Sequence, residues 1–169
     1  MELQQLANIA EIFGMIVVAI TLIFLTVQMR ENTRATRSAN ASATTELTAT
    51  WYYHISNNPQ SSALFWHYLE NPDVLTAEER FQAILSLHGL FLSFQNSFYL
   101  SRQGTLDADI RQSLTEVVVA VKHTAGIHHF WSARKKIFFK DFQEYIDGVL
   151  AADYSVSESL YREMKKPAT

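Results

Sequence analysis

The chain lacks cysteine and has few of the residues that interrupt helices, with five glycines and three prolines among 169 residues. Without cysteine there are no disulfide bonds, no thiolate metal ligands and no cysteine nucleophile, as is common in a reducing compartment. Scarce glycine and proline favour long helices over a sheet with many tight turns. The composition therefore predicts an all-α fold.

Motifs of catalysis and nucleotide binding are also missing. The net charge is −3, so the chain has no basic excess that would indicate a nucleic-acid partner. It contains neither a glycine-rich phosphate loop nor a Gly-x-Ser-x-Gly nucleophile turn. We therefore expect a protein that is not an enzyme, holds no cofactor and binds no nucleic acid.

One long uncharged stretch dominates the chain, from Ile12 to Met29, and it ends abruptly at Arg30. It consists mainly of Ile, Val, Leu and Phe, and as a helix it is long enough to cross the hydrocarbon core of a bilayer. We expect residues 1–30 to form an N-terminal segment and transmembrane anchor, with the lipid bilayer as a partner.

The stretch allows three other interpretations. A buried soluble helix would explain Thr21, Thr26 and Gln28, but few soluble helices are apolar on every side. A signal peptide would need basic residues before the run, where the chain has Glu2 and Glu11 and neither Lys nor Arg. A helix lying in the membrane interface would need a polar face, which this run does not have.

Arginines directly after the run indicate the orientation of the anchor. Arg30, Arg34 and Arg37 follow it, whereas Lys and Arg are absent before it. The positive-inside rule then predicts a single-pass membrane protein with its N-terminus outside and its C-terminal domain cytoplasmic. Their spacing places the three side chains on one helix face, near lipid head groups. A specific contact with an acidic partner is the alternative interpretation.

Small residues inside the anchor suggest contact with other helices. Gly14, Ala19 and Thr21 would let a second membrane helix approach closely. If the anchors instead assembled with one another, Thr21, Thr26 and Gln28 would line the resulting bundle. The possible partners are thus other membrane-protein subunits or further copies of this chain.

The rest of the chain predicts a helical stalk at residues 31–58, a cytoplasmic bundle of about five further helices at 59–152, and a C-terminal tail at 153–169. Pro59 suits the first turn of a helix that ends before Asn71, and Thr76 with Glu79 forms a capping-box pattern. The next helices are expected from Ala77 to about Arg102, from Thr105 or Asp107 to Val121, after Gly126, and from Lys140 or Asp141.

The helix expected over residues 77–102 carries apolar residues on most of its surface. We expect its core-facing stripe to consist of Phe81, Ile84, Leu85, His88, Phe91, Leu92, Gln95, Phe98 and Tyr99. Ser86, Gly89, Ser93, Asn96 and Ser97 would form the opposite face. Because residues 81–101 carry no charge, a second membrane segment is the alternative, although its polar side chains disfavour burial in lipid.

Histidines and aromatic residues supply the remaining candidate sites. His123 and His128 stand five residues apart, which does not match helical metal-ligand spacing, so we expect no metal site. His88 and Gln95 mark a possible buried polar pocket, although neighbouring groups would usually satisfy such side chains. Trp51, Tyr52 and Tyr53 are consecutive, so one helix face cannot bury all three, and at least one is a possible partner contact.

Several segments resemble a group of uncharacterised bacterial membrane proteins. The resemblance begins at Ala10–Gly14 and continues through Gln28–Ala35, which follows a Gln-x-Arg-x-Asn-Thr-x-Ala pattern. Later matching segments are Phe94–Tyr99, Trp131 with the basic residues after it, and Phe142-x-x-Tyr145-Ile146. The resemblance implies an inner-membrane anchor and a helical domain, and it implies no activity.

These observations together predict a membrane-anchored helical binding protein, an accessory or structural subunit of a larger bacterial membrane complex. A self-assembling homo-oligomer, acting as a pore or a sensor, is the second hypothesis. An enzyme or ligand sensor that uses the pocket at His88 and Gln95 is the third.

Overall fold

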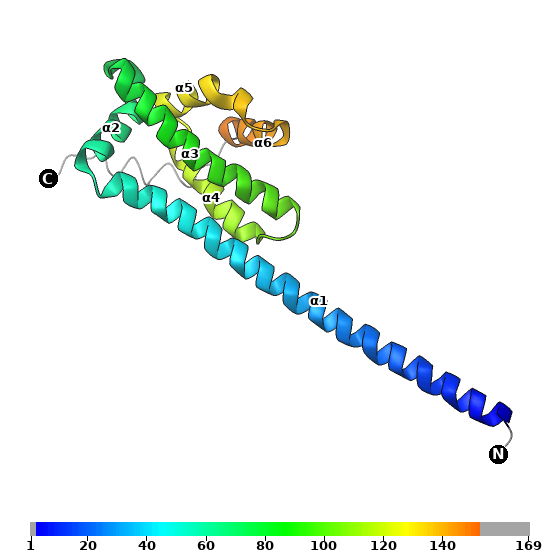
Figure 1. Ribbon diagram of the computed structural model, residues 1–169. Coiled ribbons are helices and arrows are strands. Elements are labelled where there is room, and N and C mark those ends of the chain that lie inside the picture. Colours follow the sequence, from blue (N-terminus) through cyan, green and yellow to red (C-terminus); the bar gives the residue numbers. More distant parts are fainter. Residues whose placement is uncertain (1–2, 153–169) are drawn as a thin grey trace. The chain divides into compact units, whose positions relative to one another are not determined.

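The computed structural model describes residues 3–152 as an all-α protein (Figure 1). The helices are α1 (Leu3–Ser56), α2 (Pro59–Glu70), α3 (Ala77–Arg102), α4 (Ala108–Val121), α5 (Ala125–Arg134) and α6 (Lys140–Ala151). Two 3₁₀ turns, η1 (Pro72–Val74) and η2 (Lys135–Ile137), join them, and residues 3–152 contain no strand. The predicted all-α fold with five helices after the first is confirmed. The predicted tail at 153–169 lies outside the described residues.

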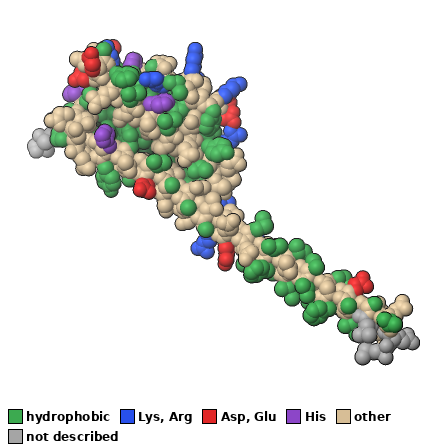
Figure 2. All heavy atoms as spheres, viewed as in Figure 1, with side chains coloured by type: hydrophobic (Ala, Val, Ile, Leu, Met, Phe, Trp, Pro, Cys, Tyr) green, Lys and Arg blue, Asp and Glu red, His purple; other side chains and the backbone are tan. Residues whose placement is uncertain are grey.

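The chain divides into two compact units, Met1–Ala39 and Asn40–Thr169, and α1 runs unbroken through the boundary. In the first unit the side chains of α1 point outward on every side. From Ile12 to Met29, each large apolar side chain is between 47% and 71% exposed, and hydrophobic atoms dominate this stretch in Figure 2. Within residues 3–152, α1 is the one helix that is long and apolar enough to cross a membrane.

Polar hydroxyls in this first unit are satisfied within the helix itself. Thr21 donates to the Val17 carbonyl at 2.8 Å, and Thr26 donates to the Leu22 carbonyl at 2.8 Å. Such i−4 bonds let threonine sit in a helix that has no water around it. The segment is therefore apolar outside and internally hydrogen-bonded, as a membrane-spanning helix must be.

The second unit begins with the last turns of α1, which pack through small polar residues. The Asn40 side chain donates to the Thr105 carbonyl at 3.0 Å, while Thr44 and Thr48 are buried. Thr48 donates to the Thr44 carbonyl, again one turn back along the helix. This part of α1 is therefore one wall of the bundle.

Local capping signals in the sequence determine where the helices begin. Asn58 accepts hydrogen bonds from the first turn of α2, and Asp107 caps α4. At α3, Glu79 N–H donates to the Thr76 hydroxyl, and Thr76 N–H donates to the Glu79 carboxylate, which is the predicted capping box. Each cap satisfies amide groups that the first helical turn leaves unpaired.

The core forms where α3 meets α4, α5 and α6. The largest fully buried side chains are Tyr68, Phe91, Phe130, Phe142, Ile127 and Ile146. Gly126 allows the start of α5 to cross the end of α2 closely, because a Cβ atom there would lie 2.7 Å from Leu69 Cα. The two helices could not approach this closely with any other residue at that position.

The predicted core stripe of α3 is partly wrong. Four of its members, Phe81, Leu85, Leu92 and Tyr99, are 46% to 58% exposed, and Ser97 from the predicted small-residue face is buried. The buried apolar side chains of α3 are Ala83, Leu87, Leu90, Phe91, Phe94 and Phe98. Because α3 is apolar on most of its circumference, periodicity could not identify the side that the other helices cover.

Candidate functional site: an aromatic junction with an apolar pocket

Trp51 forms the junction between the end of α1 and the helices α2 and α3. Its indole N–H donates to the Ser86 carbonyl at 2.9 Å and lies 3.2 Å from the Ser86 hydroxyl. Its ring meets Phe65 edge-on at 5.1 Å and Tyr52 edge-on at 5.3 Å between centroids. Such edge-to-face contacts, together with the two hydrogen bonds, fix the ring in one orientation.

An apolar pocket of about 160 Å³ lies beside this junction. The buried residues of its floor are Leu69, Leu87, Leu90, Phe91, Phe94, Val118, Val121 and Ile127. Its rim consists of Trp51, Tyr52, Ile55, Phe65 and Val117, which are half-buried or exposed. Every lining residue is aliphatic or aromatic. The pocket is thus closed below and open toward its rim.

The chemistry of the lining indicates what this pocket could hold. Its aliphatic and aromatic side chains offer an apolar molecule extensive van der Waals contact, whereas they offer water few hydrogen-bond partners. The pocket is therefore suited to an apolar occupant.

A second, larger groove of about 470 Å³ shares the wall formed by Trp51, Ile55 and Phe65. Its lining is mixed in character: apolar side chains such as Leu85 alternate with the polar side chains of His54 and Gln82. The junction therefore places an apolar pocket and a partly polar groove on either side of the same three residues.

The three consecutive aromatic residues at this junction differ in exposure. Trp51 is half-buried against the core, whereas Tyr52 is 42% exposed and Tyr53 is 65% exposed. Successive helical positions point about 100° apart, so one face cannot bury all three. Tyr53 is the most exposed of the three and is the best placed for contact with a partner. The partner contact itself stays a prediction.

His88 and Gln95 both contact the segment that leads into α6. The side-chain oxygen Oε1 of Gln95 accepts a hydrogen bond from the Phe139 N–H at 3.0 Å, and the His88 ring centroid lies 5.0 Å from that of Phe138. His88 Nδ1 is buried without a hydrogen-bond partner. Burial, and then the positive charge of Arg134, lower the pKa of His88 below its usual value. Their visible role is to hold this segment against α3.

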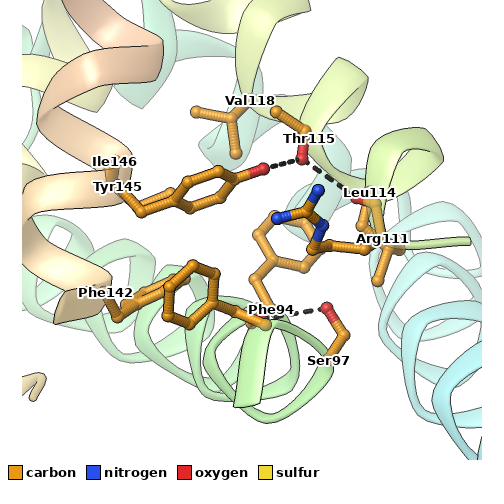
Figure 3. Close-up of a pocket in the computed structure, with 10 residues that line it drawn as sticks. Phe94, Ser97, Arg111, Leu114, Thr115, Val118, Phe142, Tyr145 and Ile146 are labelled. Carbon is orange, nitrogen blue, oxygen red and sulfur yellow. Dashed lines mark hydrogen bonds between the residues drawn. The ribbon is translucent and has the colours of Figure 1, made fainter. Parts of the chain in front are cut away.

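A polar cluster inside the bundle is too small for a substrate. The Arg111 guanidinium lies 5.6 Å from the Tyr145 ring centroid, and the Tyr145 hydroxyl lies 2.5 Å from the Thr115 hydroxyl (Figure 3). The adjoining cavity is about 10 Å³, which is about the room that one water molecule needs. This cluster was not predicted from the sequence, although Arg111 and Thr115 lie one turn apart beside the apolar face of α4.

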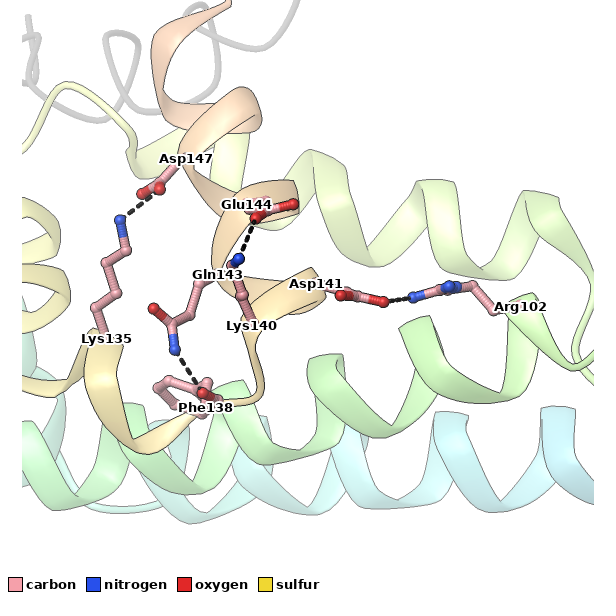
Figure 4. A network of polar contacts seen from close by, with 8 residues as sticks. All are labelled: Arg102, Lys135, Phe138, Lys140, Asp141, Gln143, Glu144 and Asp147. Atoms are coloured by element: carbon pink, nitrogen blue, oxygen red, sulfur yellow. Dashed lines mark hydrogen bonds and ion pairs between the residues drawn. The ribbon is translucent and has the colours of Figure 1, made fainter.

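A network of polar contacts on the surface connects α6 to the 3₁₀ turn η2 that precedes it (Figure 4). Asp147 accepts a hydrogen bond from the Trp131 indole at 2.8 Å and pairs with Lys135. Hydrogen bonds from Lys135 and Trp131 lower the pKa of the Asp147 carboxyl. Arg102 pairs with Asp141 in the same region. These charged groups serve the packing of α6.

The anchor residues singled out from the sequence are all exposed. Arg30, Arg34 and Arg37 line one shallow depression on α1, so they share a face as the spacing predicted. Gly14 and Thr21 also share a face, being seven residues apart, but Ala19 points about 140° away from Gly14. A single partner helix would therefore contact Gly14 and Thr21 without Ala19.

Metal-binding groups do not gather in the described part of the chain. Within residues 3–152, no three His, Asp or Glu side chains lie close enough to hold a metal ion. His129 instead contacts the buried Tyr68, with 2.9 Å between its Nδ1 and the Tyr68 hydroxyl. Burial raises the pKa of Tyr68 to about 12, so this hydroxyl stays protonated at neutral pH.

Comparisons of the chain with protein-family models, with curated proteins and with solved structures found no match.

Proposed function

We propose that this protein is a membrane-anchored helical binding protein, an accessory or structural subunit of a larger bacterial membrane complex. The observation that carries the proposal is the exposure of the apolar part of α1, where every large apolar side chain from Ile12 to Met29 is 47% to 71% exposed. Surfaces of this kind are unfavourable in water, and monomeric soluble proteins rarely expose a large contiguous apolar patch.

Lipid is a better match for this surface than a single protein partner. The exposed apolar residues surround the helix, whereas one partner helix would cover one side of it. Arg30, Arg34 and Arg37 follow directly, as expected where a helix leaves the hydrocarbon on the side of acidic head groups. In this proposal the N-terminus lies outside the inner membrane and the bundle lies in the cytoplasm.

The outer side of α3 supports a binding role for the bundle. Four large apolar side chains on this side are about half exposed, namely Phe81, Leu85, Leu92 and Tyr99. Residues 81–101 contain no Asp, Glu, Lys or Arg that would make this surface polar. An exposed apolar strip of this kind commonly marks an interface with another protein. The polar groups described above are engaged in packing, and this favours a binding role over catalysis.

Native mass spectrometry of the protein, extracted from its own membranes in mild detergent, tests this proposal. We expect the chain to appear with unrelated chains in a fixed ratio. A lone monomer, or a pure multiple of this chain, would contradict the accessory-subunit proposal. Tyr99→Lys, which adds a charge to the α3 strip, should weaken the complex. Val74→Lys, which adds the same charge at a position that is 66% exposed and lies outside α3, is the matched control for an effect specific to α3.

A self-assembling membrane oligomer is the second candidate. Gly14, Thr21 and Gln28 follow one another at intervals of seven, so they share one face of the anchor. Small and polar residues on one face permit close approach and hydrogen bonding between membrane helices. A pure multiple of this chain in the same experiment would favour this candidate over the first.

A further inference from the structure

We propose that the apolar pocket beside Trp51 binds the terminal segment of the acyl chain of a fatty acid. This goes beyond the proposed binding of protein partners, because it assigns a ligand to a pocket inside the bundle. The volume of about 160 Å³ and the largely apolar lining together define the class of ligand.

The shape of the pocket suits a single chain that enters end first. The floor is fully buried, and Leu90 and Phe91 are 4% and 1% exposed. The rim is accessible, since Tyr52 is 42% exposed and Val117 is half-buried. A chain end can therefore lie against the buried apolar floor while the polar head of the same molecule stays outside the rim.

The surroundings of the rim favour an amphiphile over a wholly apolar molecule. Trp51, Ile55 and Phe65 separate the pocket from the larger groove, whose lining includes the polar side chains of His54 and Gln82. A fatty acid has the matching arrangement, with one apolar chain and one polar head. The pocket is too small for both chains of a phospholipid, because a site for a drug-sized ligand takes about 300–1,000 Å³.

Photolabelling tests this proposal on the full chain in lipid nanodiscs. The probe is a long-chain fatty acid that carries a diazirine near its terminal methyl group. After irradiation and digestion, we expect adducts on the floor residues of α3 and α4, such as Leu90 and Val118. An excess of the unmodified fatty acid should suppress these adducts by competition.

Variants that fill the pocket supply the matched comparison. Val121→Phe, on the floor, should lower the yield of pocket adducts by about tenfold, which corresponds to about 1.4 kcal/mol of binding. Val117→Phe at the rim tests the same point without overpacking the floor. Val74→Phe is the control, because Val74 is 66% exposed and is not one of the lining residues. Circular dichroism of each variant verifies that the helices are retained.

Several results would overturn the proposal. Adducts confined to Ile12–Met29 would show contact of the probe with the anchor alone. Equal pocket labelling in folded Val117→Phe and in Val74→Phe would show that the chain end does not occupy the pocket. Labelling that only a phospholipid competes away would assign the site to a membrane lipid instead. Each of these outcomes is independent of whether native mass spectrometry finds partner subunits.

Discussion

Gly126 offers the sharpest test of how the bundle is packed. It lies at the start of α5, where this helix crosses the end of α2. A Cβ atom at Gly126 would lie 2.7 Å from Leu69 Cα and 2.8 Å from the Tyr68 carbonyl carbon, and closer still to the Tyr68 carbonyl oxygen. These are backbone atoms, so no side chain can rotate away to make room.

The expected effect of Gly126→Ala follows from two opposing terms. Alanine is favoured over glycine in a helix by about 1 kcal/mol. Overpacking a rigid core costs about 1–3 kcal/mol, and a backbone obstacle places this site at the upper end or beyond. We therefore expect a net loss of about 2 kcal/mol or more. In a chain of this size that corresponds to a fall in Tm of about 4–8 °C.

Gly148→Ala is the matched control, because nothing lies within 4 Å of a Cβ atom placed there. Its expected effect is a gain of about 0.5–1 kcal/mol, since only the helix preference remains. Thermal denaturation of both variants, followed by circular dichroism in mild detergent, measures the difference. If Gly126→Ala were as stable as Gly148→Ala, the close crossing of α2 and α5 would be refuted.

Three further predictions concern single side chains. Burial lowers the pKa of His88 from 6.5, so the unfolded chain binds a proton at this histidine before the folded chain does. The free energy of unfolding should therefore fall as the pH drops below about 6.5, and His88→Leu should remove the share of this fall that is due to His88. Burial raises the pKa of Tyr68 from 10.0 to about 12, so the unfolded chain loses the hydroxyl proton at a lower pH than the folded chain. The free energy of unfolding should therefore fall as the pH rises from 10 to about 12, and Tyr68→Phe should make this fall smaller. Asp147→Ala leaves the Trp131 indole without its acceptor and should cost about 1–3 kcal/mol in urea unfolding.

Each of these predictions has a result that would contradict it. A histidine signal for His88 that titrates at or above 6.5 in nuclear magnetic resonance would refute its burial. Ultraviolet titration would refute the burial of Tyr68 if wild type and Tyr68→Phe differed by one tyrosine that ionises near 10. Equal stability of Asp147→Ala and Lys136→Ala, a control at an exposed position, would refute the role of the Asp147–Trp131 bond.

The sequence predicted most helix boundaries because they depend on nearby residues. Pro59 begins α2, and the Thr76–Glu79 capping box begins α3, as expected. Each of these signals acts through hydrogen bonds or backbone angles within one turn, so it can be identified without knowledge of the fold. The long apolar run before Arg30 is equally local.

Contacts between distant segments could not be predicted in the same way. The pocket combines Trp51, Phe65, Leu90, Val118 and Ile127, which come from five different helices. The buried side of α3 was misjudged because its apolar residues exceed what one face can hold. The positions of the neighbouring helices, among them α2, α4 and α5, decide which of those residues are covered.

Labelling of introduced cysteines tests the central claim, the membrane-spanning anchor, most directly. The natural chain has no cysteine, so Gln5→Cys before the run and Asn96→Cys on the exposed surface of α3 each provide a single thiol. An impermeant maleimide is added to bacterial spheroplasts before or after lysis. We predict that Gln5→Cys reacts in intact spheroplasts and that Asn96→Cys reacts only after lysis. If both positions react only after lysis and the protein is released by alkali, the anchor does not cross the membrane and the account is wrong.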